Sequence, residues 1–196
     1  YTIPRSLNDT VTYLYQRDRS LMDRYEFYAT DDEAHNMHRR VIVPFTWKGE
    51  IIGYTGRAVD TDIKPKYHNS HDSNYVFNTD IQTPDKQFVI VVEGPFDAMS
   101  IDGVAILGSE ISETQADIIE SLGREVIVVP DFDAHINPKN NRKVWAGRSM
   151  TDAAVEYGWS VSFPDWDHDI KDAADAVKRY GRIYTIHSIL KTIRSE

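Results

Sequence analysis

Two buried-strand patterns that end in acidic residues constrain this chain most. The first is Val89–Val92, four apolar residues followed at once by Glu93, Gly94 and Pro95. Such a run is typical of a parallel strand buried on both faces, and α/β proteins bind their ligands at the carboxyl ends of these strands. The sequence therefore predicts that Glu93 lies at the carboxyl edge of a parallel sheet.

The second acid-ended strand comes later in the chain. Val126–Val129 leads, through a proline, to Asp131 and Asp133. Alternate residues of an extended chain point to the same side, so these two carboxylates face one way. If the two strands are neighbours, Glu93 joins them, and three such acids repel one another unless a cation lies between them. An all-oxygen ligand set favours Mg²⁺ or Mn²⁺ over zinc.

The composition limits the class of protein. A chain of 196 residues with 41% hydrophobic and 27% charged residues is ordinary for a globular protein with one large domain, or a main domain and a smaller one. It has no apolar run long enough to span a membrane and no signal-peptide pattern. Zero cysteines exclude disulfides and cysteine zinc sites within these residues. The net charge of −9 argues against a protein that coats nucleic acid, but not against an enzyme with an acidic metal site.

The first half of the chain predicts a small basic subdomain. Residues 6–28 have apolar residues at helical spacing and predict a helical hairpin that ends in an acidic loop at residues 30–33. Residues 41–45 and 51–54 predict a β-hairpin with Gly49 in its turn. Residues 39–66 contain six basic and three acidic residues, so the charge is locally reversed.

The second half alternates strands with helices, which predicts a parallel sheet. We expect the join between the halves at residues 84–86, which gives domains 1–86 and 87–196. The expected strands are residues 89–92, 104–107, 126–129 and 159–163, and the expected helices are residues 95–101, 112–122 and 153–157, one from Asp172, and residues 183–193. A basic, asparagine-rich loop at residues 134–150 interrupts the alternation.

Several motifs in this order resemble a known domain. Glu93-Gly94-Pro95-Phe96-Asp97, Asp131-Phe132-Asp133 and Lys171-Asp172 resemble the Toprim domain of topoisomerases, some nucleases, recombination proteins and DnaG-type primases. The preceding region narrows the choice. Arg40-Val41-Ile42-Val43-Pro44-Phe45, Gly53-Tyr54-Thr55-Gly56-Arg57 and Pro65-Lys66-Tyr67-His68-Asn69-Ser70 look like the basic subdomain before Toprim in DnaG-type primases. The resemblance covers about residues 39–181 and implies a Toprim-type parallel sheet flanked by helices, preceded by a smaller basic α+β subdomain.

The chain departs from this family pattern in three ways. Ala146-Gly147-Arg148 normally follows the Asp-x-Asp strand directly, but here it follows an inserted loop, residues 135–145. The late acidic motif has Asp172 and Asp175, so its second acid is either Asp175 or one of Asp167 and Asp169. The zinc-binding module and any helicase segment are absent, and the chain opens on Tyr1 rather than Met. We therefore expect a phage-type primase cut down to its catalytic core.

The resemblance implies metal-dependent synthesis of short RNA primers from nucleoside triphosphates on a single-stranded DNA template. It implies two or more Mg²⁺ or Mn²⁺ ions held by Asp131, Asp133 and Asp172, with Glu93 as a further ligand or a general base. Asp97 either reaches this site, caps a helix or orients a basic side chain, and Lys171 and Asp175 are supporting candidates. The expected nucleotide- and template-binding residues are Arg40, Arg57, Lys66, Asn69 and Arg148.

The sequence also allows purely structural roles for some of these residues and two other functions for the chain. Asp172 lies where a helix N-cap is expected, and the inserted basic loop with Trp145 is either a stacking surface for template or a plain polar loop. A Toprim nuclease uses a similar acid cluster, and a non-catalytic nucleic-acid or replisome-binding module would share the fold. For a primase, a replicative helicase and a separate zinc-binding module are expected partners, without a membrane, in the cytoplasm of a bacterium or a phage-infected cell.

Overall fold

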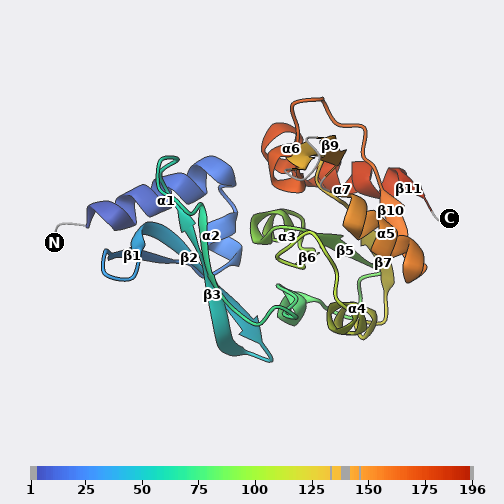
Figure 1. Ribbon diagram of the computed structural model, residues 1–196, viewed down its shortest axis with the longest axis horizontal. Coiled ribbons are helices and arrows are strands. Elements are labelled where there is room, and N and C mark those ends of the chain that lie inside the picture. The colour runs from blue at the N-terminus through green and yellow to red at the C-terminus, as the bar shows by residue number, and fades with distance from the viewer. Residues whose placement is uncertain (1–3, 133, 138–141, 146, 195–196) are drawn as a thin grey trace. The chain divides into compact units, whose positions relative to one another are not determined.

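The chain folds into two compact units, Tyr1–Ser73 and Asn74–Glu196 (Figure 1). The computed structural model describes residues 4–132, 134–137, 142–145 and 147–194. Within these ranges, no helix is both long enough and apolar enough to cross a membrane.

The first unit combines two helices with a four-stranded antiparallel sheet of order β1-β2-β3-β4. Alternating residues of β2 are buried, among them Val41, Val43 and Phe45, so one face of this strand packs into the core. The predicted β-hairpin is confirmed as β2 and β3, with Gly49 at φ +81° in its turn. The elements are α1 (Arg5–Arg17), α2 (Leu21–Arg24), β1 (Tyr28–Asp32), β2 (Met37–Trp47), β3 (Glu50–Ala58) and β4 (Tyr67–Ser70).

Two parts of the first unit differ from the prediction. The second helix of the expected hairpin is a single turn, and the expected acidic loop is the edge strand β1, in which Ala29 pairs with Val41. None of the five residues of β1 is buried, so the strand lacks the apolar alternation that marks a half-buried strand. The strand forms because its backbone pairs with β2, although its sequence shows no strand pattern.

The second unit is built on a five-stranded sheet of order β11-β10-β7-β5-β6. Strands β10, β7, β5 and β6 are parallel, as the strand–helix alternation predicts, and β11 is an antiparallel edge that the sequence did not indicate. The strands are β5 (Phe88–Val92), β6 (Val104–Ala105), β7 (Glu125–Val128), β10 (Ser160–Ser162) and β11 (Ile193–Arg194). The helices are α3 (Pro95–Ile101), α4 (Glu113–Glu120), α5 (Arg148–Glu156), α6 (Ala173–Tyr180) and α7 (Arg182–Lys191), with a 3₁₀ turn, η1 (Thr79–Ile81).

Helices cover the parallel sheet in two groups. Helices α4 and α5 pack their buried residues, including Ile119 and Met150, against Val89 and Val91 of β5 in the main hydrophobic core. Helix α3 contacts β5 and β6, and it also packs with α6 and α7 (Figure 1). Central strands buried in this way explain the continuous apolar runs in the sequence.

The boundary between the units lies before the join expected at residues 84–86. Tyr75, Val76 and Phe77 are buried, and Phe77 forms a β-bridge with Ala105. Gln115 of α4 donates one hydrogen bond to the Tyr75 carbonyl (3.0 Å). Residues 74–86 therefore pack on the second unit, although their many polar and turn-forming residues resemble a linker in the sequence.

Candidate active site

The turn after β5 presents Glu93 at the carboxyl end of a buried strand. Pro95 occupies the first turn of α3, where its missing N–H removes no helical hydrogen bond. Gly94 lies between them because a β-carbon at this position would be 2.6 Å from Oδ2 of Asp97. Glu93 itself is partly exposed, so its carboxylate lies at the edge of the sheet and not in the core.

The two acid-ended strands are neighbours, as the sequence analysis required for their acids to converge. Strands β5 and β7 pair in parallel, and the Val129 N–H continues the ladder with a hydrogen bond to the Val91 carbonyl (2.9 Å). The Asp131 N–H then donates to Oε1 of Glu93 at 3.4 Å, a long hydrogen bond. Asp133 lies outside the described residues, so its predicted place in the cluster stays a prediction.

A third acidic segment joins the same edge through backbone hydrogen bonds. The Phe132 N–H donates to the carbonyl of Lys171 (2.9 Å), which brings the segment before α6 beside the turn after β7. Asp172 is the N-cap of α6, and its Oδ1 accepts from the Asp175 N–H (2.7 Å). A carboxylate has about four lone-pair sites, so the capping bond is compatible with binding a cation as well.

Asp97 closes this set of contacts into a ring. Asp97 is 7% exposed, and its Oδ1 accepts from the Ala174 N–H in the first turn of α6 (2.9 Å). Of the three roles that the sequence left open for Asp97, the structure shows helix capping, but of α6 and not of its own helix. The Glu93, Asp131 and Lys171 segments are thus each held to the other two by hydrogen bonds, which we call the acidic ring.

The acidic ring suits a hard cation by its donor chemistry. Its side-chain oxygens belong to carboxylates, which are preferred by Mg²⁺ and Mn²⁺. Among the residues with described positions, which leave out Asp133, no group of three or more His, Asp or Glu side chains has a metal-binding arrangement. The fit therefore rests on the convergence of the three segments and on the ligand types, with Asp133 needed to complete the predicted set.

In the first unit, Arg40 is fully buried. Its guanidinium donates to three carbonyls: Asn36 (3.0 Å), Gly56 (3.0 Å) and Pro65 (2.9 Å). Burial lowers the pKa of Arg40 from its usual value, because desolvation disfavours the charged form. The guanidinium binds chain carbonyls and holds three segments of the subdomain together. The nucleotide- or template-binding role expected for Arg40 stays a prediction.

Arg57 and Lys66 lie next to each other on β3 and at the start of β4. Arg57 pairs in register with Tyr67, and its guanidinium carbon lies 4.7 Å from the centre of the Tyr67 ring. The Lys66 ammonium lies 5.6 Å from the same ring centre. Nε and Nη1 of Arg57 are covered and have no hydrogen-bond partner among the described residues. Two cations beside one aromatic ring form a positive site suited to a phosphate group.

No family model matches the chain, but relatives in sequence and in structure are primases. The DNA primase of Aquifex aeolicus is 30% identical over 163 residues, which cover 74% of this chain and 30% of that protein. The DNA primase of Clostridium acetobutylicum is 29% identical over 133 residues, which cover 60% of this chain and 20% of that protein. The chain thus spans less than a third of the length of these curated relatives.

A comparison with solved structures shows which fold the chain adopts. The structure of the DnaG primase catalytic domain bound to single-stranded DNA matches 97% of this chain and 73% of that chain, with a TM-score of 0.71 and 17% identity. Sequence and fold together identify a DnaG-type primase core. The α/β fold class predicted from the sequence is confirmed by the same match.

The remaining predicted residues of the primase core lie mostly at the surface. Asn69 is exposed on β4, and its Oδ1 accepts a hydrogen bond from the Thr55 hydroxyl. Arg148 begins α5, and its Nε lies 3.6 Å from Oδ2 of Asp152, with both side chains more than 70% exposed. Such a pair contributes little to stability, so Arg148 is not fixed by it. Lys171 is exposed, and Asp175 supplies the amide that Asp172 caps.

Two features of the primase core were not visible in the sequence. The pairing of Phe132 with Lys171 and the hydrogen bond from Ala174 to Asp97 both join residues far apart in the chain. Among these contacts, only the hydrogen bond between Asp172 and Asp175 could be predicted from the local sequence, because the two residues have the spacing of an N-cap and the amide that it binds. No local sequence pattern predicts that Arg40 is buried.

Proposed function

We propose that this primase core catalyses metal-dependent, DNA-templated synthesis of short RNA primers. The observation that carries the proposal is the acidic ring, which holds three acidic segments together at the carboxyl edge of a parallel sheet. The relatives named DNA primase support the same conclusion.

In this mechanism the second unit carries the nucleotidyl transfer. Two or more bound Mg²⁺ or Mn²⁺ ions supply neutralisation of the charge that develops as a 3′-hydroxyl attacks a triphosphate and pyrophosphate leaves. Asp131, Asp133 and Asp172 would hold these ions in the predicted Toprim-type site. Glu93 either completes the ligand set or accepts the proton of the attacking hydroxyl, and its position at the end of β5 fits both roles.

The first unit binds phosphate groups of the template or of the incoming triphosphate. Arg57 and Lys66 provide the charge. The two covered nitrogens of Arg57 that have no hydrogen-bond partner among the described residues support an anion there. Asn69 supplies a further polar contact on β4. Arg40 acts indirectly, because its hydrogen bond to the Pro65 carbonyl fixes the residue next to Lys66. We expect Lys66→Gln to raise KM for the nucleoside triphosphate or the template while leaving kcat near the wild-type value.

We also propose the setting that primer synthesis requires. Single-stranded DNA is the template and nucleoside triphosphates are the substrates. A replicative helicase and a separate zinc-binding module are the proposed partners in the full-length protein, in the cytoplasm of a bacterium or a phage-infected cell. The matched catalytic domain bound to single-stranded DNA supports the choice of template.

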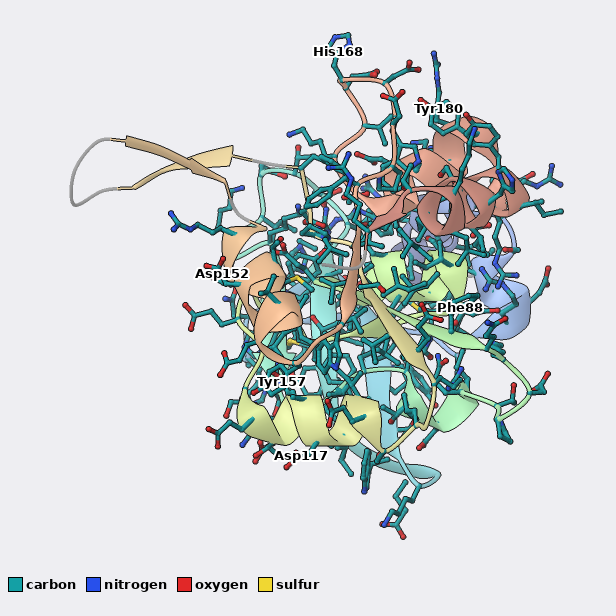
Figure 2. All side chains as sticks on the ribbon, turned by 90° about the vertical axis from the view of Figure 1, so that its right-hand side faces the viewer. Phe88, Asp117, Asp152, Tyr157, His168 and Tyr180 are labelled. Atoms are coloured by element: carbon teal, nitrogen blue, oxygen red, sulfur yellow. The ribbon has the colours of Figure 1, made fainter. Side chains whose placement is uncertain are left out.

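The test is incorporation of labelled nucleotides on single-stranded DNA with Mg²⁺ or Mn²⁺. The wild type should make short RNA, and Asp131→Asn with Asp133→Asn should make none. Asp117→Asn is the control, because Asp117 is an exposed acid of α4 (Figure 2), a helix that contributes no residue to the acidic ring. Labelled strand without nucleotides is incubated in parallel. Degradation of that strand without incorporation would replace the primase proposal with a Toprim nuclease.

A further inference from the structure

The turn that carries Asp131 leads into an inserted hairpin. Strands β8 (Ala134–Asn137) and β9 (Arg142–Trp145) pair antiparallel where the sequence predicted a basic loop, and they form a sheet of their own among the described strands. The main parallel sheet therefore does not continue beyond this turn. Contacts with other segments of the second unit must fix the position of Asp131.

Phe132, the residue after Asp131, makes two contacts with the loop between β10 and α6. Its N–H donates to the Lys171 carbonyl (2.9 Å). Its ring centre lies 5.8 Å from that of Trp166, with 66° between the ring planes, which is the edge-to-face arrangement that aromatic pairs prefer. Successive side chains of an extended chain point to opposite sides, so a contact with the Phe132 ring leaves the side of the carboxylates open.

Trp166 is itself fixed to helix α7. The indole Nε1–H donates to the Ser188 hydroxyl (2.8 Å), and this hydroxyl donates to the Thr185 carbonyl (2.7 Å). Thr185 is fully buried, so this part of α7 belongs to the interior of the second unit. The indole thus links a buried turn of α7 to the residue beside Asp131.

The loop that carries Trp166 also leads to Asp172. The Asp167 N–H donates to the Tyr180 hydroxyl of α6 (3.0 Å), and Ile170 is buried. Figure 2 shows this loop, with His168 at its outer end. Because the loop is held at several points, the contact between Trp166 and Phe132 ties the turn of Asp131 to a fixed segment that ends at Asp172.

We propose that Trp166 is a positioning residue of the acidic ring. Through the Phe132 ring it holds the turn of Asp131 beside the segment of Asp172. Converging carboxylates repel one another when no cation lies between them, so contacts outside the cation site must hold their segments together. The loss of such supporting contacts typically costs about 10–100-fold in metal affinity. That the ring binds a cation rests on the proposed function, whereas the contacts of Trp166 do not.

The test is the Mn²⁺ affinity of the full chain, measured by calorimetric titration at a temperature where thermal melts show every variant to be folded. Trp166→Leu removes the aromatic ring and the indole donor and should weaken Mn²⁺ binding about tenfold. Trp166→Phe keeps an aromatic ring and should restore part of the affinity. Phe132→Leu should weaken binding to a similar extent. The double variant should lose no more than either leucine variant, because both side chains act through one contact.

Tyr157→Leu is the matched control. Tyr157 and Trp159 form another aromatic pair of the second unit, with 5.0 Å between ring centres, and neither residue belongs to the acidic ring. Equal losses of affinity in Tyr157→Leu and Trp166→Leu would overturn the positioning role, and so would additive losses in the double variant.

Primer synthesis by the wild type is measured separately. Synthesis by the wild type together with unchanged Mn²⁺ affinity in Trp166→Leu would refute the positioning role alone. The expected losses of affinity without any synthesis by the wild type would refute the proposed function alone. A wild type that binds no Mn²⁺ would refute both.

Discussion

Among the described residues, each of the two units buries one charged side chain that hydrogen-bonds to backbone groups, but the two side chains have opposite charges and different partners. Arg40 in the first unit donates to three carbonyls from a turn, a strand and a loop. Asp97 in the second unit accepts from an amide in the first turn of α6. A cationic side chain can donate hydrogen bonds to carbonyl groups of strands and loops. An anionic side chain can accept hydrogen bonds from the N–H groups in the first turn of a helix, which have no partner within the helix.

In each unit, the buried charged side chain fixes the backbone beside an exposed charged residue. Arg40 fixes the Pro65 carbonyl, and the next residue, Lys66, is exposed. Asp97 fixes the start of α6, whose N-cap Asp172 is partly exposed. In both units the buried charge holds the backbone, and a neighbouring residue of the same sign faces outward. Substitutions can separate the two kinds of role.

The largest effect is expected for an outward-facing acid. Glu93→Gln should lower primer synthesis at least about a hundredfold, because the amide cannot accept a proton or bind a cation as a carboxylate does. The melting temperature should stay near that of the wild type, since the amide oxygen still accepts from the Asp131 N–H. Incorporation assays and thermal melts measure the two effects. A melting temperature that falls with the activity would make Glu93 a structural residue and break the comparison.

The next effect is expected for the buried cation. Arg40→Met should lower the free energy of unfolding by about 3 kcal/mol, because three carbonyls lose their donor. Arg40→Lys should rescue only part of this loss, since one ammonium cannot reproduce the guanidinium fork. Urea denaturation gives the free energy, with Arg19→Met as an exposed control. An unchanged stability combined with weaker DNA binding would instead favour the direct template-binding role expected from the sequence.

The buried anion should show a smaller effect that depends on its hydrogen bond. Asp97→Ala removes the acceptor for the Ala174 N–H and should cost about 1–2 kcal/mol, as the loss of a helix cap does. Asp97→Asn keeps an acceptor oxygen and should cost less. Calorimetric titration with Mn²⁺ should show weaker binding for the alanine variant than for the asparagine variant. Equal loss of Mn²⁺ binding in both would make Asp97 a ligand rather than a positioning residue.

The smallest effect is a pH dependence in the first unit. The hydrogen bond from the Arg39 guanidinium holds the pKa of Asp60 below its ordinary value. A carboxylate with a lowered pKa in the folded state stabilises the fold at neutral pH, and this contribution is lost as the pH falls through that pKa. Asp60→Asn should therefore cost less than about 1 kcal/mol at pH 7, because the pair is partly exposed.

Denaturation curves of wild type and Asp60→Asn between pH 7 and pH 3 measure this dependence. The difference between them should shrink below the ordinary aspartate pKa of about 3.9. Asp62→Asn, which removes a carboxylate at an exposed position near Asp60, is the control for the loss of one negative charge. A difference that grows on acidification would contradict the direction of the pKa shift.

Local sequence patterns predicted most strands and helices of the fold. They did not predict the contacts between residues far apart in the chain. The strand at Val89–Val92 and the helix capped by Ser112 follow from apolar runs and a capping box, which lie within a few residues. Strand β1 was missed because its order comes from pairing with β2. The adjacency of the two acid-ended strands was stated only as a condition, and the enclosure of Arg40 and Asp97 depends on partners up to 77 residues away. No local pattern encodes those partners.

The acidic ring also sets when such a site can first exist during synthesis. Its hydrogen bonds join residues separated by 38 positions between Glu93 and Asp131 and by 77 between Asp97 and Ala174. Contacts between residues so distant in sequence form late, because a large loop must close before they are made. A growing chain that has not yet released α6 from the ribosome therefore lacks one side of the ring. We expect nascent chains to gain tight cation binding only after α6 has left the ribosome.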